Sequence, residues 1–355
     1  MSKISHTFLH VEIRQGRRLN TDQHEHKLPH MKVLVTGASG FLGSHIVDVF
    51  TEAGFDVRAM VRRSSNLRWL KGKKVEIVFA SLEDRGSLTR ACAQVEAVVH
   101  AAGAIKAARE SDFSRINTKG TRNLLQACIS RNSPPLFIYV SSAGAQGPSR
   151  SSEPLRESDT PRPVTAYGRS KLAAERLVLE ASGSVPVVVL RPGGIFGPRD
   201  SEFLPLFRMA AFSPVIFGSG LRVRRVCVTH ARDVARCILL AVRQSQARGK
   251  VFLVGGHNTT QRRLLSEIAA AVGKNPLVLA APSPLIRFAG LLSSAGARLT
   301  GKPRLFTFDN CRRLLARNWW IDDTLARDIL GYRAEIPLKE GLEECARWYR
   351  REGFL

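Results

Sequence analysis

Long hydrophobic runs, closely spaced cysteines and acidic residues are all scarce in this chain of 355 residues. The first 30 residues are polar and contain no continuous apolar segment, so we expect no secretory signal. The six cysteines lie far apart, and no two of them have the two-residue spacing of a metal or redox site. Five of the nine histidines fall within residues 1–30, but their spacing is irregular. These absences predict free thiols, a reducing cytoplasmic location and no metal site.

Acidic residues number 30 against 54 lysines and arginines, which gives a net charge of +24. Such an excess is typical of proteins that bind nucleic acid or anionic membranes. The basic residues are nevertheless spread along the chain, with 27 of them against 13 acidic residues in 191–355. The densest cluster is only Arg222, Arg224 and Arg225, and no aromatic side chains are interleaved with it. A well-solvated basic surface accounts for this pattern best, and we expect no binding to nucleic acid.

One weakly charged segment, Asn275 to Ala297, contains Arg287 as its single charge. Prolines interrupt its first half and leave a helix of about Leu285 to Leu299, which is shorter than the ~20 residues that a membrane span needs. We expect this helix to pack into its own part of the fold through four apolar side chains, Leu285, Phe288, Leu292 and Leu299. An exposed apolar lid, or a helix that rests on a membrane, is the alternative.

Hydrophobic residues make up 44% of the chain, which is enough for a substantial core. From Met31 onward, short apolar runs alternate with segments of helical spacing such as 41–53 and 111–131. The runs of strand length are 33–35, 57–61, 75–79, 97–99, 136–140 and 187–190. Strands that are apolar on both faces and alternate with helices predict a parallel sheet covered on both sides, that is, a Rossmann-type, doubly wound α/β fold.

A glycine-rich turn joins the first expected strand to the first expected helix. Its residues are Gly37, Ser39, Gly40, Phe41, Leu42 and Gly43. Glycines at this spacing let the backbone turn tightly and approach a pyrophosphate, while free N–H groups at the helix start face the phosphate charge. We therefore expect three regions: a disordered extension (1–30), an NAD(P)-binding domain (31–191), and a smaller substrate lobe (192–355) that is interleaved with the last strands.

The second expected strand ends in Arg62 and Arg63, at the place where an acidic residue commonly binds the ribose 2′-hydroxyl. A guanidinium group suits a 2′-phosphate instead, so this pair favours NADP over NAD. The alternative is that both arginines are simply solvated.

Tyr167 and Lys171 are four residues apart on an expected helix, 166–179, and therefore share one face of it. An ammonium group near a tyrosine stabilises the phenolate and makes it a better acid or base. The strand that precedes them delivers Ser141 and Ser142 to the carboxyl edge of the sheet, where ligands bind in such folds. We take Tyr167, Lys171 and Ser142 as the candidate catalytic residues.

These motifs, in this order, resemble the extended short-chain dehydrogenases/reductases, also called the NAD-dependent epimerase/dehydratase family. The resemblance extends from Met31 to the C-terminus and includes 100–103, 117–121, 141–143, Arg191-Pro192, 195–198 and 233–235. It implies that Tyr167 is the general acid/base, that Lys171 holds the nicotinamide ribose and lowers the pKa of Tyr167, and that Ser142 binds the reacting oxygen. It also implies cofactor contacts from Phe41, Leu42, Ala101, Ala102, Gly103, Asn117 and Pro192.

The chain departs from the family after its third strand. Many members have an aspartate there for the adenine amino group, whereas this chain has Ala80, Ser81 and Leu82. The resemblance therefore implies a weaker adenine contact, or one made by Ser81.

Within the family, the arginines after the second strand and the C-terminal features resemble the 3β-hydroxysteroid dehydrogenase and dihydroflavonol reductase branch. Those C-terminal features are 308–310, 320–323, 330–332 and the end of the chain with Trp348 and Tyr349. This branch implies hydride transfer between nicotinamide and a ketone or secondary alcohol on a lipophilic, sterol- or flavonoid-like substrate. The alternative is a sugar-nucleotide epimerase or dehydratase with tightly bound NAD, in which Arg222, Arg224 and Arg225 would meet the diphosphate. The resemblance also implies a homodimer, and contact of the basic second lobe with an anionic membrane is a further expectation.

Overall fold

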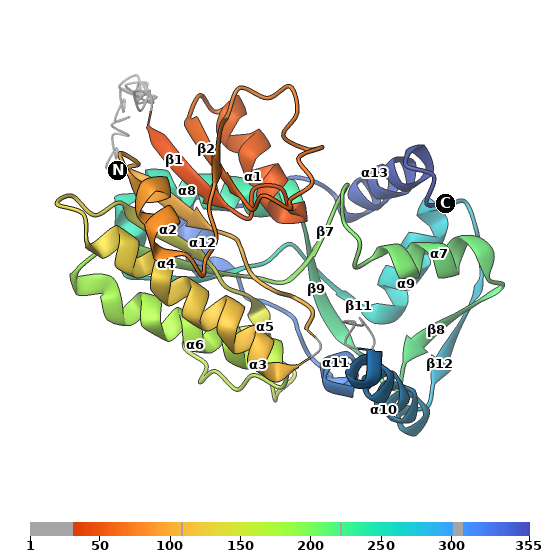
Figure 1. Ribbon diagram of the computed structural model, residues 1–355. Helices are drawn as coiled ribbons and strands as arrows, with labels where there is room; N and C mark the ends of the chain where they lie inside the picture. Colours follow the sequence, from red (N-terminus) through yellow and green to blue (C-terminus); the bar gives the residue numbers. More distant parts are fainter. Residues whose placement is uncertain (1–30, 108, 221, 301–307) are drawn as a thin grey trace, which may run out of the picture.

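The structure, a computed structural model, describes residues 31–107, 109–220, 222–300 and 308–355 (Figure 1). The extension expected at residues 1–30 lies outside the described residues, as does the side chain of Leu299.

A sheet of seven parallel strands, in the order β10-β6-β5-β4-β1-β2-β3, forms the centre of the larger lobe. Its strands are β1 (Lys32–Thr36), β2 (Asp56–Val61), β3 (Glu76–Phe79), β4 (Ala97–His100), β5 (Leu136–Val140), β6 (Val187–Pro192) and β10 (Val251–Val254). Each of the six apolar runs predicted as strands is one of these. The doubly wound α/β fold is thereby confirmed, and the seventh strand, β10, comes from the second half of the chain.

Helices cover both faces of this sheet (Figure 1). On one face lie α1 (Phe41–Glu52), α8 (Ala231–Arg243) and α12 (Thr324–Leu330), which pack with Val33 and Val35 of β1. On the other face α2 (Arg85–Cys92), α4 (Gly120–Ile129) and α6 (Ala166–Glu180) pack with Leu34. Successive residues of β1 thus enter different cores, which is why its sequence is apolar without alternation.

Short helices complete the larger lobe. They are α3 (Glu110–Phe113), the π-helix η1 (Ser114–Lys119), α5 (Ala143–Gln146), and the 3₁₀ turns η2 (Ala181–Gly183) and η3 (Ser245–Ala247). The helix predicted over 111–131 is thus present as α3, η1 and α4 in succession. A π-helical turn inside a helix is uncommon and often lies at a functional position.

The smaller lobe contains two further sheets. One has the order β11-β9-β7 and consists of β7 (Gly194–Phe196), β9 (Arg225–His230) and β11 (His257–Thr260). The other pairs β8 (Val215–Ser219) with β12 (Leu277–Ala281) in parallel. Around a core that includes Phe207, Ile268 and Tyr349 lie α7 (Leu204–Phe212), α9 (Gln261–Ala271) and α13 (Leu338–Arg351). The remaining helices are α10 (Ser283–Thr300) and α11 (Phe308–Leu315).

The predicted apolar helix is present as α10, but its expected packing is wrong. Leu285, Phe288 and Leu292 are 59–60% exposed, whereas Ile286 is only 8% exposed. The apolar residues of this helix include adjacent pairs such as Leu285 and Ile286, which point to different sides, so helical period alone does not select the buried stripe. Among the helices that the structure describes, none is long and apolar enough to cross a membrane.

The strand order changes direction between β1 and β4, which are adjacent and parallel: β2 and β3 lie beyond β1, whereas β5 and β6 lie beyond β4. In open α/β sheets a ligand binds at the carboxyl ends of strands at such a switch point. The glycine-rich turn follows β1, residues 101–103 follow β4, and Ser141 and Ser142 follow β5. The fold therefore gathers most of the predicted site residues along one edge.

Candidate active site

The turn after β1 has the close packing that its glycines predict. Gly37 adopts a φ of +71°, and its carbonyl accepts a hydrogen bond of 2.9 Å from the N–H of Gly40. A Cβ atom on Gly43 would lie 2.0 Å from the Gly37 oxygen, and one on Gly37 would lie 2.9 Å from the Ala102 nitrogen. Gly40 precedes α1 without a side-chain cap. The first N–H groups of α1 are thus left to a ligand, and the turn fits a pyrophosphate.

A buried polar chain holds the ends of β1 and β4 together. The Thr36 hydroxyl lies 2.8 Å from Nδ1 of His100, whose Nε2 lies 2.9 Å from the Thr121 hydroxyl. The N–H of Ala102 donates to Thr36 Oγ1 across 3.1 Å. Burial lowers the pKa of His100 to about 3, so this imidazole is neutral at physiological pH. This row of hydrogen bonds fixes the backbone at residues 101 and 102 without adding a charge.

Asn117, in η1, fastens the loop after β4 to the helix that carries Tyr167. Its Oδ1 accepts from the N–H of Ala104 at 2.7 Å, and its Nδ2 donates to Ser170 Oγ at 2.9 Å. The Ser170 hydroxyl in turn donates to the Tyr167 carbonyl at 2.7 Å. A Cβ atom on Gly103 would lie 3.0 Å from Asn117 Oδ1, which explains the small residue there.

The residues predicted to meet the adenosine half of the cofactor follow β2 and β3. Arg62 and Arg63 are exposed at the end of β2, and the Arg63 guanidinium lies 5.7 Å from the centroid of the Phe79 ring. The Ser81 N–H donates to Ser87 Oγ at 3.2 Å, and Leu82 packs against Gly120, where a Cβ would lie 3.0 Å from the leucine side chain. Ser81 and Leu82 thus form a fixed turn, whereas the two arginines project from the edge of the sheet.

Tyr167 and Lys171 both lie on α6, as predicted. The helix starts at Ala166 with the Thr165 side chain accepting from the N–H of Gly168 at 3.0 Å. The N–H of Ala166 donates to Asp309 Oδ2 at 2.7 Å, so α11 of the smaller lobe also holds this end of α6. Tyr167 therefore sits where the two lobes touch.

Ser142 and Tyr167 are close neighbours. Ser142 accepts from the N–H of Gly144 at 3.0 Å, and a Cβ on Gly144 would lie 3.2 Å from Ser142 Oγ and 3.7 Å from the Tyr167 ring. Burial raises the pKa of Tyr167, while a hydrogen bond from Ser142 and the positive charge of Arg313 oppose that rise. A carbonyl oxygen between the two hydroxyls could receive hydrogen bonds from both.

Lys171 lies one helical turn beyond Tyr167 and is buried. Its Nζ donates to the Val140 carbonyl at 2.6 Å and lies 4.2 Å from the centroid of the Tyr139 ring. Burial lowers the pKa of Lys171 to about 7, and the nearby Glu175 carboxylate limits the fall. The spacing and the resemblance predict that Lys171 lowers the Tyr167 pKa. In this structure burial raises that pKa, and the Lys171 ammonium donates to Val140, so the lowering by Lys171 stays a prediction.

A sequence model of the NAD dependent epimerase/dehydratase family matches residues 33–255. The chain belongs to this family. It is an NAD(P)-dependent oxidoreductase of the extended short-chain type. The ceramide reductase of Caulobacter vibrioides is 32% identical over 325 residues, which cover 91% of this chain and 96% of that protein. Sterol demethylase protein B of Methylococcus capsulatus is 30% identical over 342 residues, or 92% of this chain and all (100%) of that protein. The solved UDP-glucose 4-epimerase of Thermotoga maritima superimposes with a TM-score of 0.71 at 25% identity, over 91% of this chain and 99% of that one.

A buried network of hydrogen bonds and an ion pair lies next to the candidate active site of this epimerase/dehydratase family member. It was not predicted from the sequence. Glu175 Oε2 accepts from Ser141 Oγ at 2.8 Å and from Arg191 Nε at 3.0 Å, and the Arg191 guanidinium also contacts Gln146. The network joins α6, the end of β5 and the end of β6, where Pro192 follows Arg191. Glu175 is four residues after Lys171, so the spacing of Tyr167, Lys171 and Glu175 could have revealed it.

Two residues of the arginine cluster considered for a diphosphate have structural contacts. Arg224 is buried, and its guanidinium donates to the carbonyls of Ser219 and Leu315. Arg225 donates to the Ser152 carbonyl at 2.9 Å, and its guanidinium lies 4.7 Å from the centroid of the Trp320 ring. Arg222 is exposed.

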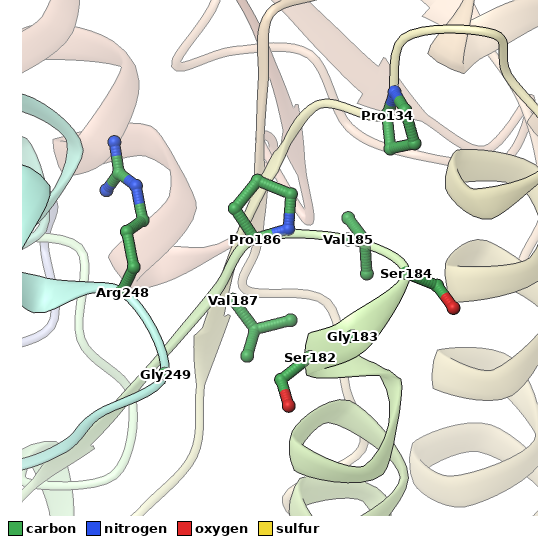
Figure 2. Close-up of a pocket in the computed structure, with 9 residues that line it drawn as sticks. All are labelled: Pro134, Ser182, Gly183, Ser184, Val185, Pro186, Val187, Arg248 and Gly249. Carbon is green, nitrogen blue, oxygen red and sulfur yellow. The ribbon is translucent and has the colours of Figure 1, made fainter.

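A shallow cavity of about 560 Å³ lies away from this edge of the sheet (Figure 2). It is lined by Pro134, residues 182–187, Arg248 and Gly249, at the start of β6 rather than at its end. The Arg248 guanidinium donates to backbone carbonyls at the end of α8, including that of Ala241 at 3.1 Å. None of the predicted site residues lines this cavity.

Proposed function

We propose that this chain is an NADP(H)-dependent oxidoreductase that interconverts a ketone and a secondary alcohol on a lipophilic, sterol- or flavonoid-like molecule. The observation that carries the proposal is the meeting of Ser142 and Tyr167 at the carboxyl end of β5, with Lys171 one turn along the same helix. The names of its relatives, a ceramide reductase and a sterol demethylase protein, support a lipophilic substrate.

When bound, the nicotinamide would supply the hydride for the carbonyl carbon in reduction, or accept the hydride of the alcohol carbon in oxidation. Ser142 holds the substrate oxygen, and Tyr167 donates its phenolic proton to that oxygen in reduction and takes it back in oxidation. Lys171, with a pKa of about 7, provides the positive charge that stabilises the tyrosinate and binds the nicotinamide ribose. The pyrophosphate is held by the glycine-rich turn, that is, by Gly37, Ser39, Gly40, Phe41, Leu42 and Gly43. The nicotinamide half is bordered by Ala101, Ala102, Gly103, Asn117 and Pro192.

Arg62 and Arg63 support the choice of NADP(H) over NAD(H). Both are exposed at the carboxyl end of β2, which pairs with β1 ahead of the glycine-rich turn, and a guanidinium group there suits an adenosine 2′-phosphate. Ser81 and Leu82 border the adenine. NAD(H) stays usable in this proposal, with lower affinity.

The proposal includes the compartment and the oligomeric state of the enzyme. Six free, buried thiols support a reducing cytoplasm, and the family resemblance supports a homodimer. Contact between the smaller lobe and a membrane is argued separately below.

A panel of sterol, flavonoid and aliphatic ketones with NADPH or NADH, followed by loss of reduced-cofactor absorbance, tests the activity. Tyr167→Phe should abolish turnover and leave NADPH binding intact. Tyr349→Phe, the same change at a buried position of α13, should leave both turnover and NADPH binding intact. Near-normal turnover by Tyr167→Phe would overturn the assignment. Conversion of UDP-glucose without net cofactor consumption would favour the epimerase alternative.

The cofactor preference has its own test. Arg62→Ser should weaken NADPH binding by about 30-fold, since hydrogen bonds to a charged group contribute about 2 kcal/mol, and should leave NADH binding unchanged. Arg347→Ser, which removes an exposed arginine from α13, is the matched control. Equal affinity of the wild type for both cofactors would refute the preference.

A further inference from the structure

An exposed apolar surface at the end of the smaller lobe has no role in the chemistry described above. On α10, Leu285, Phe288, Leu291 and Leu292 are each 52–60% exposed, while Ile286 faces inward. Between Ser283 and Gly296 the one charged residue is Arg287. Single exposed leucines are ordinary, but four on one short stretch of helix are typical of a surface that meets an apolar partner.

A second group of exposed apolar side chains lies on the two-stranded sheet that precedes α10. Leu279 of β12 pairs with Phe217 of β8, and Leu277 pairs with Val215, so their side chains share one face of the sheet. Phe217, Leu277 and Leu279 are exposed, whereas Ile216 faces the core beside α9. Figure 1 shows α10 beginning where β8 and β12 end, at the extremity of the smaller lobe. We call Phe217, Leu277, Leu279, Leu285, Phe288, Leu291 and Leu292 the apolar tip.

The charged residues in the segments that form the apolar tip are all positive. Residues 213–222 and 272–296, which contain β8, β12 and most of α10, hold Arg222, Lys274 and Arg287 and no acidic residue. The exposed cations Arg222, Lys274 and Arg287 are beside tip residues or within a few positions of them in the sequence. Apolar side chains flanked by cations complement a bilayer that has an apolar interior and anionic headgroups.

The apolar tip is also joined to the catalytic helix. The Cys311 thiol of α11 lies 3.4 Å from the Ile286 carbonyl, on the inward side of α10. Two residues earlier, Asp309 accepts the hydrogen bond from Ala166, the neighbour of Tyr167. One short helix therefore separates the surface from the catalytic tyrosine.

We propose that the apolar tip rests on a lipid bilayer that contains anionic lipids. The helix α10 lies in the interface without crossing it, and Arg222, Lys274 and Arg287 face the headgroups. The connection of α10 through α11 to the start of α6 then holds Tyr167 on the membrane side of the protein, so that a lipophilic substrate reaches it from the bilayer. The entry of substrate from the membrane rests on the proposed function, whereas the docking of the apolar tip does not.

Sedimentation with vesicles tests the docking, with pure phosphatidylcholine vesicles compared with vesicles that also contain phosphatidylglycerol. The full chain should bind the anionic vesicles more tightly, by about fivefold for each of the three cations, and high salt should reduce this difference. Leu285→Gln combined with Leu292→Gln should weaken binding at least about tenfold, because two exposed leucines no longer enter the apolar layer. Ile129→Gln, at an exposed position of α4, is the matched control and should bind as the wild type does.

Several results would overturn the proposal. They are failure of the wild type to bind anionic vesicles, unchanged binding by the double variant, or a wild-type dimer that the double variant converts to a monomer. The last result would assign the apolar tip to contact between two copies. Unchanged melting temperature and NADPH binding would show that the double variant is folded. If the wild type binds vesicles but turns over no ketone, the docking stands and the proposed function is refuted. If the double variant loses vesicle binding but turns over a water-soluble ketone as the wild type does, docking is a property separate from catalysis.

Discussion

Replacing Glu175 by glutamine should test both the stability and the chemistry of the site. The Glu175 and Arg191 side chains are only 1% and 5% exposed, and the carboxylate accepts from the Arg191 guanidinium and from Ser141. Glutamine keeps the shape but leaves a buried guanidinium without its counter-charge. Breaking a buried pair in this way costs about 3–5 kcal/mol. At about 2 °C per kcal/mol for a chain of this size, Tm should fall by about 6–10 °C.

The same substitution should move the pH dependence of turnover. Glu175 raises the pKa of Lys171, which burial has lowered to about 7. Without the carboxylate, this pKa falls further, so the limb of the pH–rate profile that reports Lys171 should move to lower pH. A residue that only filled space would change Tm and leave this limb in place.

Circular dichroism melts and pH–rate profiles measure the two effects. The control is Glu110→Gln, which breaks an exposed pair between Glu110 of α3 and Arg169 of α6 and should change stability by less than about 0.5 kcal/mol. Adding Arg191→Met to Glu175→Gln should recover about 1–3 kcal/mol, because the unpaired charge is gone. The reasoning is refuted if the two single changes are additive, or if Glu175→Gln is as mild as the control.

Two further predictions concern the glycine turn and the buried histidines. Gly43→Ala should abolish NADPH binding measured by fluorescence titration, because its Cβ would lie 2.0 Å from the Gly37 oxygen, whereas Gly183→Ala, with open space around it, should bind normally. Burial lowers the pKa of His45 and of His100 to about 3, so each contributes stability at neutral pH that is lost as pH falls below about 6.5. The raised pKa of Asp200, about 6, acts in the opposite direction below that pH. His100→Asn should therefore lower the proton uptake that accompanies urea unfolding at about pH 5 by about one proton. An unchanged slope in His100→Asn would contradict this account of His100.

The parts of the fold that were predictable are those in which one physical requirement dominates. Strands buried on both faces need apolar residues throughout, so β1 and β5 are evident in the sequence. The turn at Gly37 and Gly43 was equally evident, because only glycine tolerates such close backbone contacts. Tyr167 and Lys171 were found through a spacing that places them on one helix face.

Other features depend on contacts between distant segments. Glu175 was missed because its importance comes from Arg191 and Gln146, which reach it from β6 and α5. The exposure of Leu285 and Phe288 was not predicted because the apolar residues of α10 cover more than one side of the helix, and the sequence does not indicate which of these sides packs inward. Its inward face is set by the position of α11, which the local sequence does not determine.

The place of β10 in the large sheet has a consequence for how the protein is made. β10 covers the outer edge of β6 through parallel pairing from Val251↔Val189 to Val254↔Pro192. During synthesis on a ribosome, β6 leaves the exit tunnel long before its partner, after which the chain must still produce β7, β8, β9 and α8. Until Val254 emerges, a strand that begins with the apolar run 187–190 has an open edge that another chain could pair with. The nascent protein is therefore most vulnerable to aggregation in this interval, and a chaperone that shields the edge of β6 would act at this stage.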